Sequence, residues 1–313
     1  MKILLTGASG FVGSNLAAVF AAHGAELACP SHAGLDLTDR DATLRYSAAA
    51  APDAIVHAAI LNDPAAMAAD RTAAWDAYVG ATRNVVDAAN AAGAHAVLIS
   101  TDWVFDGTQG PAAEDAPPNP VNQYGFLKAA SELVVAERAE RGTVARVAGV
   151  QGVHRARPHS ADFVGKHRRA PRRQDFGFGY LVASVVESLR AGEPFTVWES
   201  DAINTLATPT LATAAGELIW RALERGATGV LHCCGGEHAD RVGLARRAAQ
   251  AFDLDPALVR TAPPPEPPTG AVPYDTRLDA RATASALAVE LPDLDAQLSR
   301  LRHELEEQAC LTT

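Results

Sequence analysis

The N-terminal segment constrains the fold more than any other part of the chain. Lys2 to Gly7, KILLTG, is a short apolar run that ends in a glycine, and an alanine-rich stretch from Ser14 to His23 follows before Gly24. The apolar run predicts a buried strand, and the stretch behind it predicts a helix. The chain therefore begins with a strand, a glycine turn and a helix.

The same alternation continues over the first half of the chain. Further strand-like runs are AELAC, AIVHAA, AVLIS and TVARVAGV, and helical patterns follow Asp39, extend from Asp70 to Ala92 and begin again near Tyr124. Repeated strand–helix units predict a parallel, doubly wound α/β sheet of the Rossmann type with helices on both faces.

The second half alternates less regularly. It contains a helical pattern from Tyr180 to Arg190, the strand-like runs PFTVW and GVLHCC, and a further helical pattern from Thr210 to Arg225. We expect residues 1–152 to form a dinucleotide-binding domain completed by parts of 177–234, and residues 153–313 to form a smaller, interleaved substrate-binding lobe.

Two segments near the C-terminus have clear local patterns. APPPEPPTG, from Ala262 to Gly270, predicts a surface connector because proline lacks the N–H that a regular element needs. The leucines at 294, 298, 301 and 305 are spaced for one face of an amphipathic helix.

Composition excludes several functional classes. The chain is 48% hydrophobic and 20% charged, with a net charge of -10, so we expect a globular protein that does not bind nucleic acid. Its four cysteines lack metal-ligand spacing and are expected to be reduced, mostly buried thiols, with no metal site. There is no membrane-length apolar run and no leader pattern, so we expect no membrane contact and a cytoplasmic location.

Gly7, Gly10 and Gly13 are spaced as G-x-x-G-x-x-G between the first strand and the first helix. At this place a backbone without side chains can approach a pyrophosphate, and the N–H groups of the helix terminus point at the anion. The residues expected to bind the cofactor are Gly7, Ser9, Gly10, Phe11, Val12, Gly13, Asp36, Leu37, His57, Ala58, Ala59, Ser100, Tyr124 and Lys128.

The adenosine side of this site lies after the second strand. Asp36 and Leu37 stand where contacts to the adenosine half are expected, whereas Asp39 is placed to cap the following helix. The second strand ends in Cys29, Pro30, Ser31 and His32, without a carboxylate to bind the ribose 2′-hydroxyl. We therefore expect NADP or NAD, with NADP slightly favoured.

Tyr124 and Lys128 are four residues apart and share one face of the predicted helix. We expect the Lys128 ammonium to favour ionisation of the Tyr124 phenol, so that the phenol can pass a proton to a carbonyl group. Thr101 ends the AVLIS strand, at the edge where ligands of such sheets bind, and its hydroxyl can orient the carbonyl oxygen. The three form a predicted catalytic set.

Longer motifs carry a family resemblance. STDWVFDG at 100–107, PPNPVNQYGFLKAASE at 117–132 and TLATPTLATAAGELIW at 205–220 resemble segments of the extended short-chain dehydrogenases/reductases, closest to the dTDP-4-dehydrorhamnose reductase group. The resemblance covers nearly the whole chain. It implies NAD(P)H-dependent reduction of a nucleotide-activated 4-keto-6-deoxy sugar, with hydride from the nicotinamide and a proton from Tyr124.

The resemblance also bears on the substrate side. Related dehydratases have Thr-Asp-Glu where this chain has Thr101, Asp102 and Trp103, so the base for water elimination is missing and carbonyl reduction is favoured. The substrate-binding residues implied are Asp102, Trp103, Val104, Phe105, Arg168 and Arg172.

Two departures from the family pattern stand out. Tyr78 occupies the place of an asparagine that usually organises the catalytic lysine and a water, so the proton relay is expected to differ. The segment from His154 to Arg173 is unusually basic, and Arg168 and Arg172 are hypothesised to meet a nucleotide diphosphate, although a solvated loop explains the charge equally well. An unchanged KM in the two alanine variants would contradict the hypothesis.

Two other functions stay open. One is an epimerase, or a reductase of another carbonyl; the other is a regulatory protein that binds the cofactor without turnover. The predicted helices at 70–92 and 125–141 also present apolar faces that serve either the core or a homodimer.

Overall fold

A central parallel sheet confirms the doubly wound α/β prediction. The computed structural model describes residues 1–61, 63–156 and 174–310. Its largest sheet has six strands in the order β10-β5-β4-β3-β1-β2. The elements up to β5 are β1 Lys2–Thr6, α1 Phe11–Ala22, β2 Glu26–Ala28, α2 Arg40–Ala50, β3 Ala54–His57, α3 Pro64–Ala69, α4 Arg71–Trp75, the π-helical turn η1 Asp76–Gly80, α5 Ala81–Ala92, β4 His95–Thr101, the 3-10 turn η2 Asp102–Val104, α6 Gln123–Arg138 and β5 Gly142–Val147.

The remaining elements build the second lobe and complete the first. They are β6 Val150–Gln151, α7 Leu181–Arg190, β7 Phe195–Trp198, β8 Leu206–Ala207, β9 Thr210–Leu211, α8 Ala212–Arg225, β10 Gly229–His232, β11 Ala239–Asp240, α9 Arg241–Ala251, η3 Pro256–Leu258, β12 Val259–Ala262, α10 Arg281–Leu287 and α11 Leu294–Cys310. No helix among the described residues is long and apolar enough to cross a membrane.

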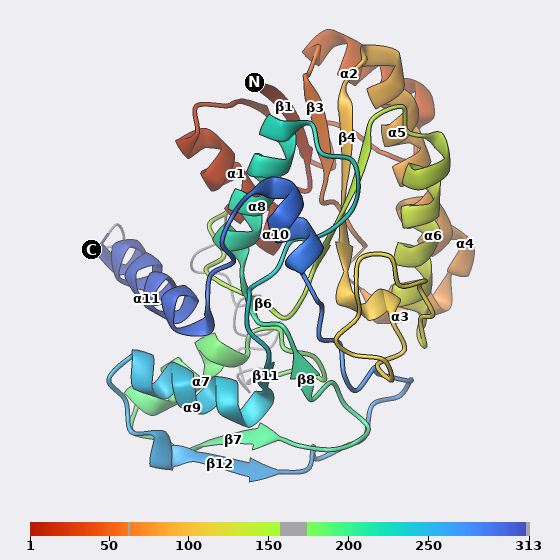
Figure 1. Ribbon diagram of the computed structural model, residues 1–313. Helices are drawn as coiled ribbons and strands as arrows, with labels where there is room; N and C mark the ends of the chain where they lie inside the picture. Colours follow the sequence, from red (N-terminus) through yellow and green to blue (C-terminus); the bar gives the residue numbers. More distant parts are fainter. Residues whose placement is uncertain (62, 157–173, 311–313) are drawn as a thin grey trace.

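Both faces of the sheet are covered, as Figure 1 shows: α1 and α8 pack on one face and α2, α5 and α6 on the other. Alternate residues of β1 serve the two faces, since Ile3 and Leu5 join one hydrophobic cluster and Leu4 joins another. The strand order changes direction at β1, and ligands of open α/β sheets bind beyond the carboxyl ends of the strands at such a point.

The second lobe packs below the sheet in the view of Figure 1. Strand β7 pairs with β12 in parallel, and α7, α9 and α11 share one hydrophobic cluster with them. Leu294, Leu298 and Leu301 are buried there and Leu305 packs against it, as their spacing predicted. The chain crosses between the lobes, because α8 and β10 return to the large sheet.

The local predictions were mostly accurate, with shifts at element ends. Helix α1 begins at Phe11, directly after the glycine turn, rather than at Ser14. The helix expected from Asp70 to Ala92 is interrupted by the π-helical turn η1, which contains Tyr78. Asp39 caps α2, and its side chain accepts a hydrogen bond from the backbone N–H of Ala42.

Candidate active site

The glycine turn lies against the end of the neighbouring strand. Gly7 has a φ of +74°, and a Cβ added there would lie 2.5 Å from the backbone nitrogen of Ala59. A Cβ on Gly13, in the first turn of α1, would clash with the carbonyl of Gly7. Glycine is therefore needed at position 13 as well. Gly10, the N-cap residue of α1, brings no side chain to the helix terminus. This cradle fits the pyrophosphate of a dinucleotide.

His57 and the two alanines after it form the wall of that cradle. The His57 Nδ1 lies 2.8 Å from the hydroxyl oxygen of Thr6, so the ring ties β3 to β1 inside the protein. Burial, and then the charge of Lys128, lower the pKa of His57 to about 3. His57 is therefore neutral, while Ala58 and Ala59 offer backbone rather than side chains to a ligand.

The two residues expected to contact adenosine, Asp36 and Leu37, already have partners within the protein. The Asp36 carboxylate is exposed, but its Oδ1 accepts hydrogen bonds from the backbone N–H and the hydroxyl of Thr38. These bonds hold the pKa of Asp36 below its usual value. Leu37 packs against the hydrophobic cluster beneath α5. Contacts of both residues with adenosine stay predictions.

Thr101, Tyr124 and Lys128 come together at the carboxyl end of β4. Thr101 is the last residue of β4, and Tyr124 and Lys128 lie on the first two turns of α6, whose N-terminus is capped by the Asn122 side chain. The Thr101 side chain is close enough to the Tyr124 phenol to lower its pKa. The ring of Trp103 meets that of Tyr124 edge-on, with centroids 6.3 Å apart.

The direction predicted for the pKa of Tyr124 was wrong. Burial and the nearby charge of Asp102 outweigh the Thr101 contact and raise it to about 12. The Lys128 Nζ instead donates a hydrogen bond to the backbone carbonyl of Ile99 at 2.8 Å. Burial lowers the pKa of Lys128 to about 8, even though Glu132 opposes the change. Tyr124 is therefore held in its protonated form.

Comparison with known proteins assigns the chain to a protein family. The model of the RmlD substrate binding domain matches residues 1–175. The chain belongs to this family. The assignment confirms the resemblance to extended short-chain dehydrogenases/reductases of the dTDP-4-dehydrorhamnose reductase group.

Two curated relatives and one solved structure illustrate the range of this RmlD-type family. The chain is 29% identical over 262 residues to dTDP-4-keto-6-deoxy-D-glucose reductase of Streptomyces niveus, covering 83% of this chain and 82% of that protein. It is 34% identical over 160 residues to methionine adenosyltransferase 2 subunit beta of Rattus norvegicus. That match covers only about half of each protein, 48% of this chain and 47% of the relative. The dTDP-4-dehydrorhamnose reductase of Bacillus anthracis, solved in complex with NADP, shares the fold with a TM-score of 0.79 at 20% identity, covering 97% of this chain and 99% of that one.

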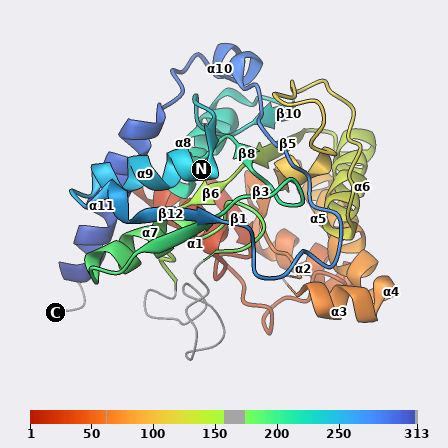
Figure 2. The same cartoon turned by 90° about the horizontal axis from the view of Figure 1, so that it is seen from below.

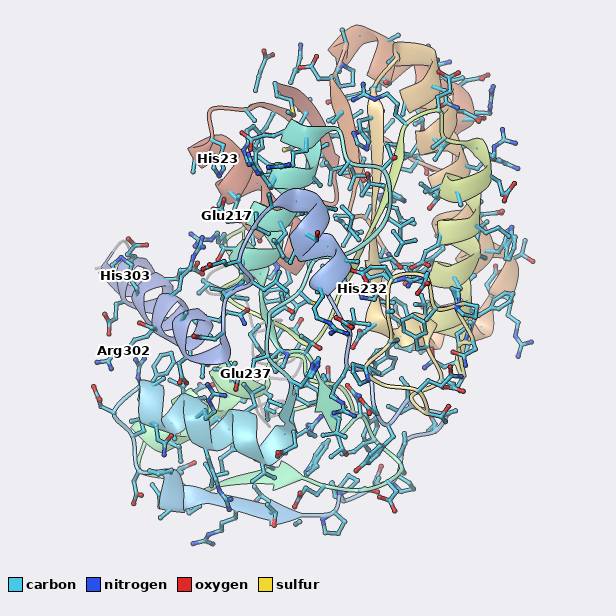
Figure 3. All side chains as sticks on the ribbon, viewed as in Figure 1. His23, Glu217, His232, Glu237, Arg302 and His303 are labelled. Carbon is cyan, nitrogen blue, oxygen red and sulfur yellow. The ribbon has the colours of Figure 1, made fainter. Side chains whose placement is uncertain are left out.

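Behind Thr101, Tyr124 and Lys128 of this RmlD-type protein lies a buried ionic network that the sequence did not reveal. Glu132 lies one helical turn after Lys128. Its carboxylate accepts hydrogen bonds from two guanidinium nitrogens of Arg146 and from the hydroxyl of Ser100, the last at 2.5 Å. Arg146 also contacts His232, which lies beside α10 (Figure 3). Ser100, a predicted cofactor ligand, is thus turned into the protein, and its cofactor contact stays a prediction.

The four residues after Thr101 do not share one environment. Asp102 is buried next to Thr101, and Trp103 remains partly accessible beside Tyr124. Val104 and Phe105 are buried in a hydrophobic cluster, and the Phe105 ring lies 4.9 Å from the Arg146 guanidinium carbon. The side chains of Val104 and Phe105 pack inward as core residues, and their contact with a substrate stays a prediction.

Tyr78, on the π-helical turn η1, is buried beside Tyr124 and Lys128. It is 3% exposed, and its hydroxyl donates to the backbone carbonyl of Leu61 at 3.1 Å. Its ring meets Tyr124 edge-on at 6.2 Å and lies 5.6 Å from the Lys128 Nζ. Tyr78 therefore contacts both catalytic candidates through its ring, while its hydroxyl points elsewhere.

The basic segment is only partly described. Arg168 and Arg172 lie outside the described residues. Arg155, near the start of the segment, contacts Asn15 on α1 and forms an ion pair with Glu304 on α11 at 3.3 Å. This arginine links the glycine-turn helix to the second lobe. The described residues contain no cluster of His, Cys, Asp and Glu able to hold a metal ion.

Proposed function

We propose that this protein is an NAD(P)H-dependent reductase of a keto group on a nucleotide-activated 4-keto-6-deoxy sugar. The proposal rests mainly on one observation: Thr101, Tyr124 and Lys128 come together at the same edge of the sheet as the glycine turn. The substrate class is that of the Streptomyces niveus relative, which is named as a dTDP-4-keto-6-deoxy-D-glucose reductase and aligns over most of both chains.

The proposed reaction divides the work between cofactor and protein. The reduced nicotinamide supplies the hydride to the carbonyl carbon. Tyr124 transfers its phenolic proton to the carbonyl oxygen, which becomes the alcohol. A phenol whose pKa lies near 12 holds that proton at neutral pH, which suits the reductive direction. Lys128, as a buried cation, stabilises the phenolate that the transfer leaves behind.

We propose NADP as the preferred cofactor. Strand β2 ends at Ala28 and is followed by Cys29, Pro30, Ser31 and His32, so no carboxylate there repels a ribose 2′-phosphate. Asp36, the next carboxylate along the chain, accepts a hydrogen bond from the backbone N–H of Thr38. Arg168 and Arg172 stay candidates for the substrate diphosphate.

A regulatory, non-catalytic function is the second candidate. Two observations favour it. The relative at 34% identity over about half of each chain is named as a subunit of methionine adenosyltransferase and not as a reductase, and Tyr78 lies beside Lys128. Turnover separates the two candidates, since only the reductase consumes cofactor.

The test is oxidation of NADPH and NADH with a panel of nucleotide-linked 4-ketosugars, for the wild type and Tyr124→Phe. We expect turnover by the wild type and a loss of about 10²–10⁴-fold in the variant, because phenylalanine keeps the ring but lacks the proton donor. Cofactor binding, followed by nicotinamide fluorescence, should be unchanged. Substantial residual turnover in the variant would contradict the role of Tyr124, and cofactor binding without any turnover in the wild type would favour the regulatory function.

We also propose a homodimer formed through α4 and α6. These helices lie on the outer flank of the large sheet (Figures 1 and 2), and they expose Trp75, Phe126 and Leu133 by 43%, 54% and 61%. The Trp75 and Phe126 rings contact each other, and Leu133 lies two helical turns beyond Phe126 on the same face of α6. A cytoplasmic location is proposed with the reductase function, because its free thiols and its nicotinamide cofactor are typical of that compartment.

A further inference from the structure

Asp102 is a buried carboxyl group with an incomplete set of partners. Its side chain is only 4% exposed. Oδ1 accepts a hydrogen bond from the hydroxyl of Thr101 at 3.0 Å, whereas Oδ2 is buried and has no hydrogen-bond partner among the described residues. A buried carboxylate with an unpaired oxygen is costly, and the neutral acid is less so. The environment therefore favours protonation of Asp102.

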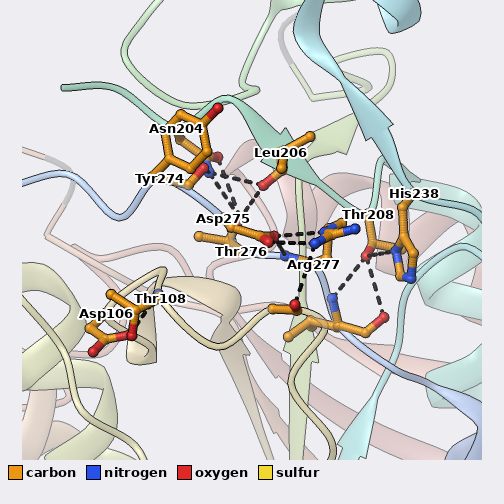
Figure 4. A network of polar contacts seen from close by, with 12 residues as sticks. Asp106, Thr108, Asn204, Leu206, Thr208, His238, Tyr274, Asp275, Thr276 and Arg277 are labelled. Atoms are coloured by element: carbon orange, nitrogen blue, oxygen red, sulfur yellow. Dashed lines mark hydrogen bonds and ion pairs between the residues drawn. The ribbon is translucent and has the colours of Figure 1, made fainter. Parts of the chain in front are cut away.

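Among the described residues, none of the groups that influence Asp102 offsets this cost with positive charge. Thr276 faces it from the second lobe and lowers its pKa somewhat, and Asn204 holds Thr276 in place at 3.2 Å (Figure 4). Tyr124 faces it from α6, and Cys234 faces it from the segment after β10; both have raised pKa values, so both are neutral.

The charged neighbours of Thr276 are already paired. Asp275 and Arg277 form an ion pair with each other at 2.6 Å, also drawn in Figure 4. Burial is then the largest influence on Asp102 and raises its pKa to about 6. Both protonation states are accessible in the neutral range.

The protonation state of Asp102 decides what the Thr101 hydroxyl can do. A hydroxyl has one proton to donate and two lone pairs to accept with. In Thr101 one lone pair accepts from the backbone N–H of Trp103 at 3.2 Å. An ionised Asp102 can only accept, so it takes the single Thr101 proton. A neutral Asp102 can donate to Thr101 instead, and the Thr101 proton is then released for another acceptor.

We propose that Asp102 is a positioning residue for carbonyl reduction: its neutral form turns the Thr101 hydroxyl toward the substrate carbonyl oxygen, beside the Tyr124 donor. In the ionised form Thr101 donates to Asp102, and the carbonyl oxygen loses one of its two hydrogen bonds. Each oxyanion donor of this kind is worth about 10²–10³ in rate. The inference rests on the proposed reductase function and assigns Asp102 a role through Thr101.

The test is the pH dependence of kcat/KM for wild type, Asp102→Asn and Thr101→Val, with Thr101→Ser as the conservative control. For the wild type we expect kcat/KM to fall about tenfold per pH unit above the Asp102 pKa, until the ionised form's lower rate is reached. The asparagine amide can donate to Thr101 at every pH, so Asp102→Asn should lack this fall. Thr101→Val should be slow at every pH and should also lack it, whereas Thr101→Ser should retain it.

A spectroscopic readout keeps the test independent of turnover. Infrared difference spectra between low and high pH should show the carbonyl band of a neutral carboxylic acid that titrates near pH 6 and is absent in Asp102→Asn. Three results would overturn the inference: a pH-independent wild type in this range, the same fall in Asp102→Asn, or no such band. By contrast, a wild type that reduces no ketosugar, yet shows the band, would overturn the proposed function alone.

Discussion

At the scale of single residues, Lys128 shows what burial costs a charged side chain. It is 4% exposed and its ammonium has one carbonyl partner, Ile99, in the described structure. Its pKa falls from the ordinary 10.5 to about 8, so the unfolded chain binds a proton more tightly than the folded protein between these values. The stability of the fold therefore rises with pH across that window. A residue kept at this cost suits a function rather than packing.

We expect Lys128→Met to abolish reductase activity and yet to raise the free energy of unfolding at pH 7 by about 1–2 kcal/mol, after the lost hydrogen bond is counted. The gain should be full below pH 8, should shrink between pH 8 and 10.5, and should disappear above pH 10.5, where the wild-type lysine becomes neutral in the unfolded state as well. Urea unfolding of both proteins at several pH values measures it. Lys2→Met, at a partly exposed lysine, is the control and should show no such gain.

At the scale of elements, the β1–α1 turn is specified by contacts as well as by backbone conformation. Gly7 and Gly24 have nearly the same φ, +74° and +76°, but different surroundings. A Cβ on Gly7 would meet the backbone of Ala58 and Ala59, whereas nothing lies within 4 Å of a Cβ on Gly24. The pair separates conformational strain from steric exclusion.

Gly24→Ala should cost about 1 kcal/mol of stability, the usual penalty for a left-handed residue. Gly7→Ala should cost more than about 3 kcal/mol, because β3 must also move, and it should weaken NADPH binding. Chemical unfolding and a fluorescence titration measure the two effects. Equal costs for the two variants would show that the close approach to β3 is not important.

At the scale of the whole molecule, the lobes are interleaved and one flank is apolar. Strand β10 and α8 return to the large sheet after the chain has passed through the second lobe. The predicted division at residue 152 stays a prediction, as does the completion of the first domain by residues within 177–234, the range that contains α8 and β10. The flank formed by α4 and α6 is where a second copy is proposed to bind.

Leu133→Glu should convert the proposed dimer to a monomer, because it replaces the most exposed apolar side chain of α6 with a charge. Light scattering coupled to size-exclusion chromatography measures the mass. Ala257→Glu adds the same charge at an exposed position of the second lobe and should leave the dimer intact. A monomeric wild type at micromolar concentration would contradict the proposal.

Local patterns in the sequence were sufficient for the elements and for much of the site. Strand and helix order, the glycine turn, and the grouping of Thr101, Tyr124 and Lys128 follow from periodicity and from the rule that parallel strands end at one edge. These features depend on residues a few positions apart. The Asp39 cap is predictable for the same reason.

Tertiary structure alone decided the electrostatics of the site and the fate of its neighbours. Asp102 is protonated more readily because burial raises its pKa to about 6, although the hydroxyl of Thr276, far along the chain, opposes the change. Ser100 turns toward Glu132 and Arg146, and Phe105 packs under that arginine. The sequence determined which groups stand at the sheet edge, whereas burial by distant segments determined which of them are charged, because the cost of a charge depends on everything packed around it.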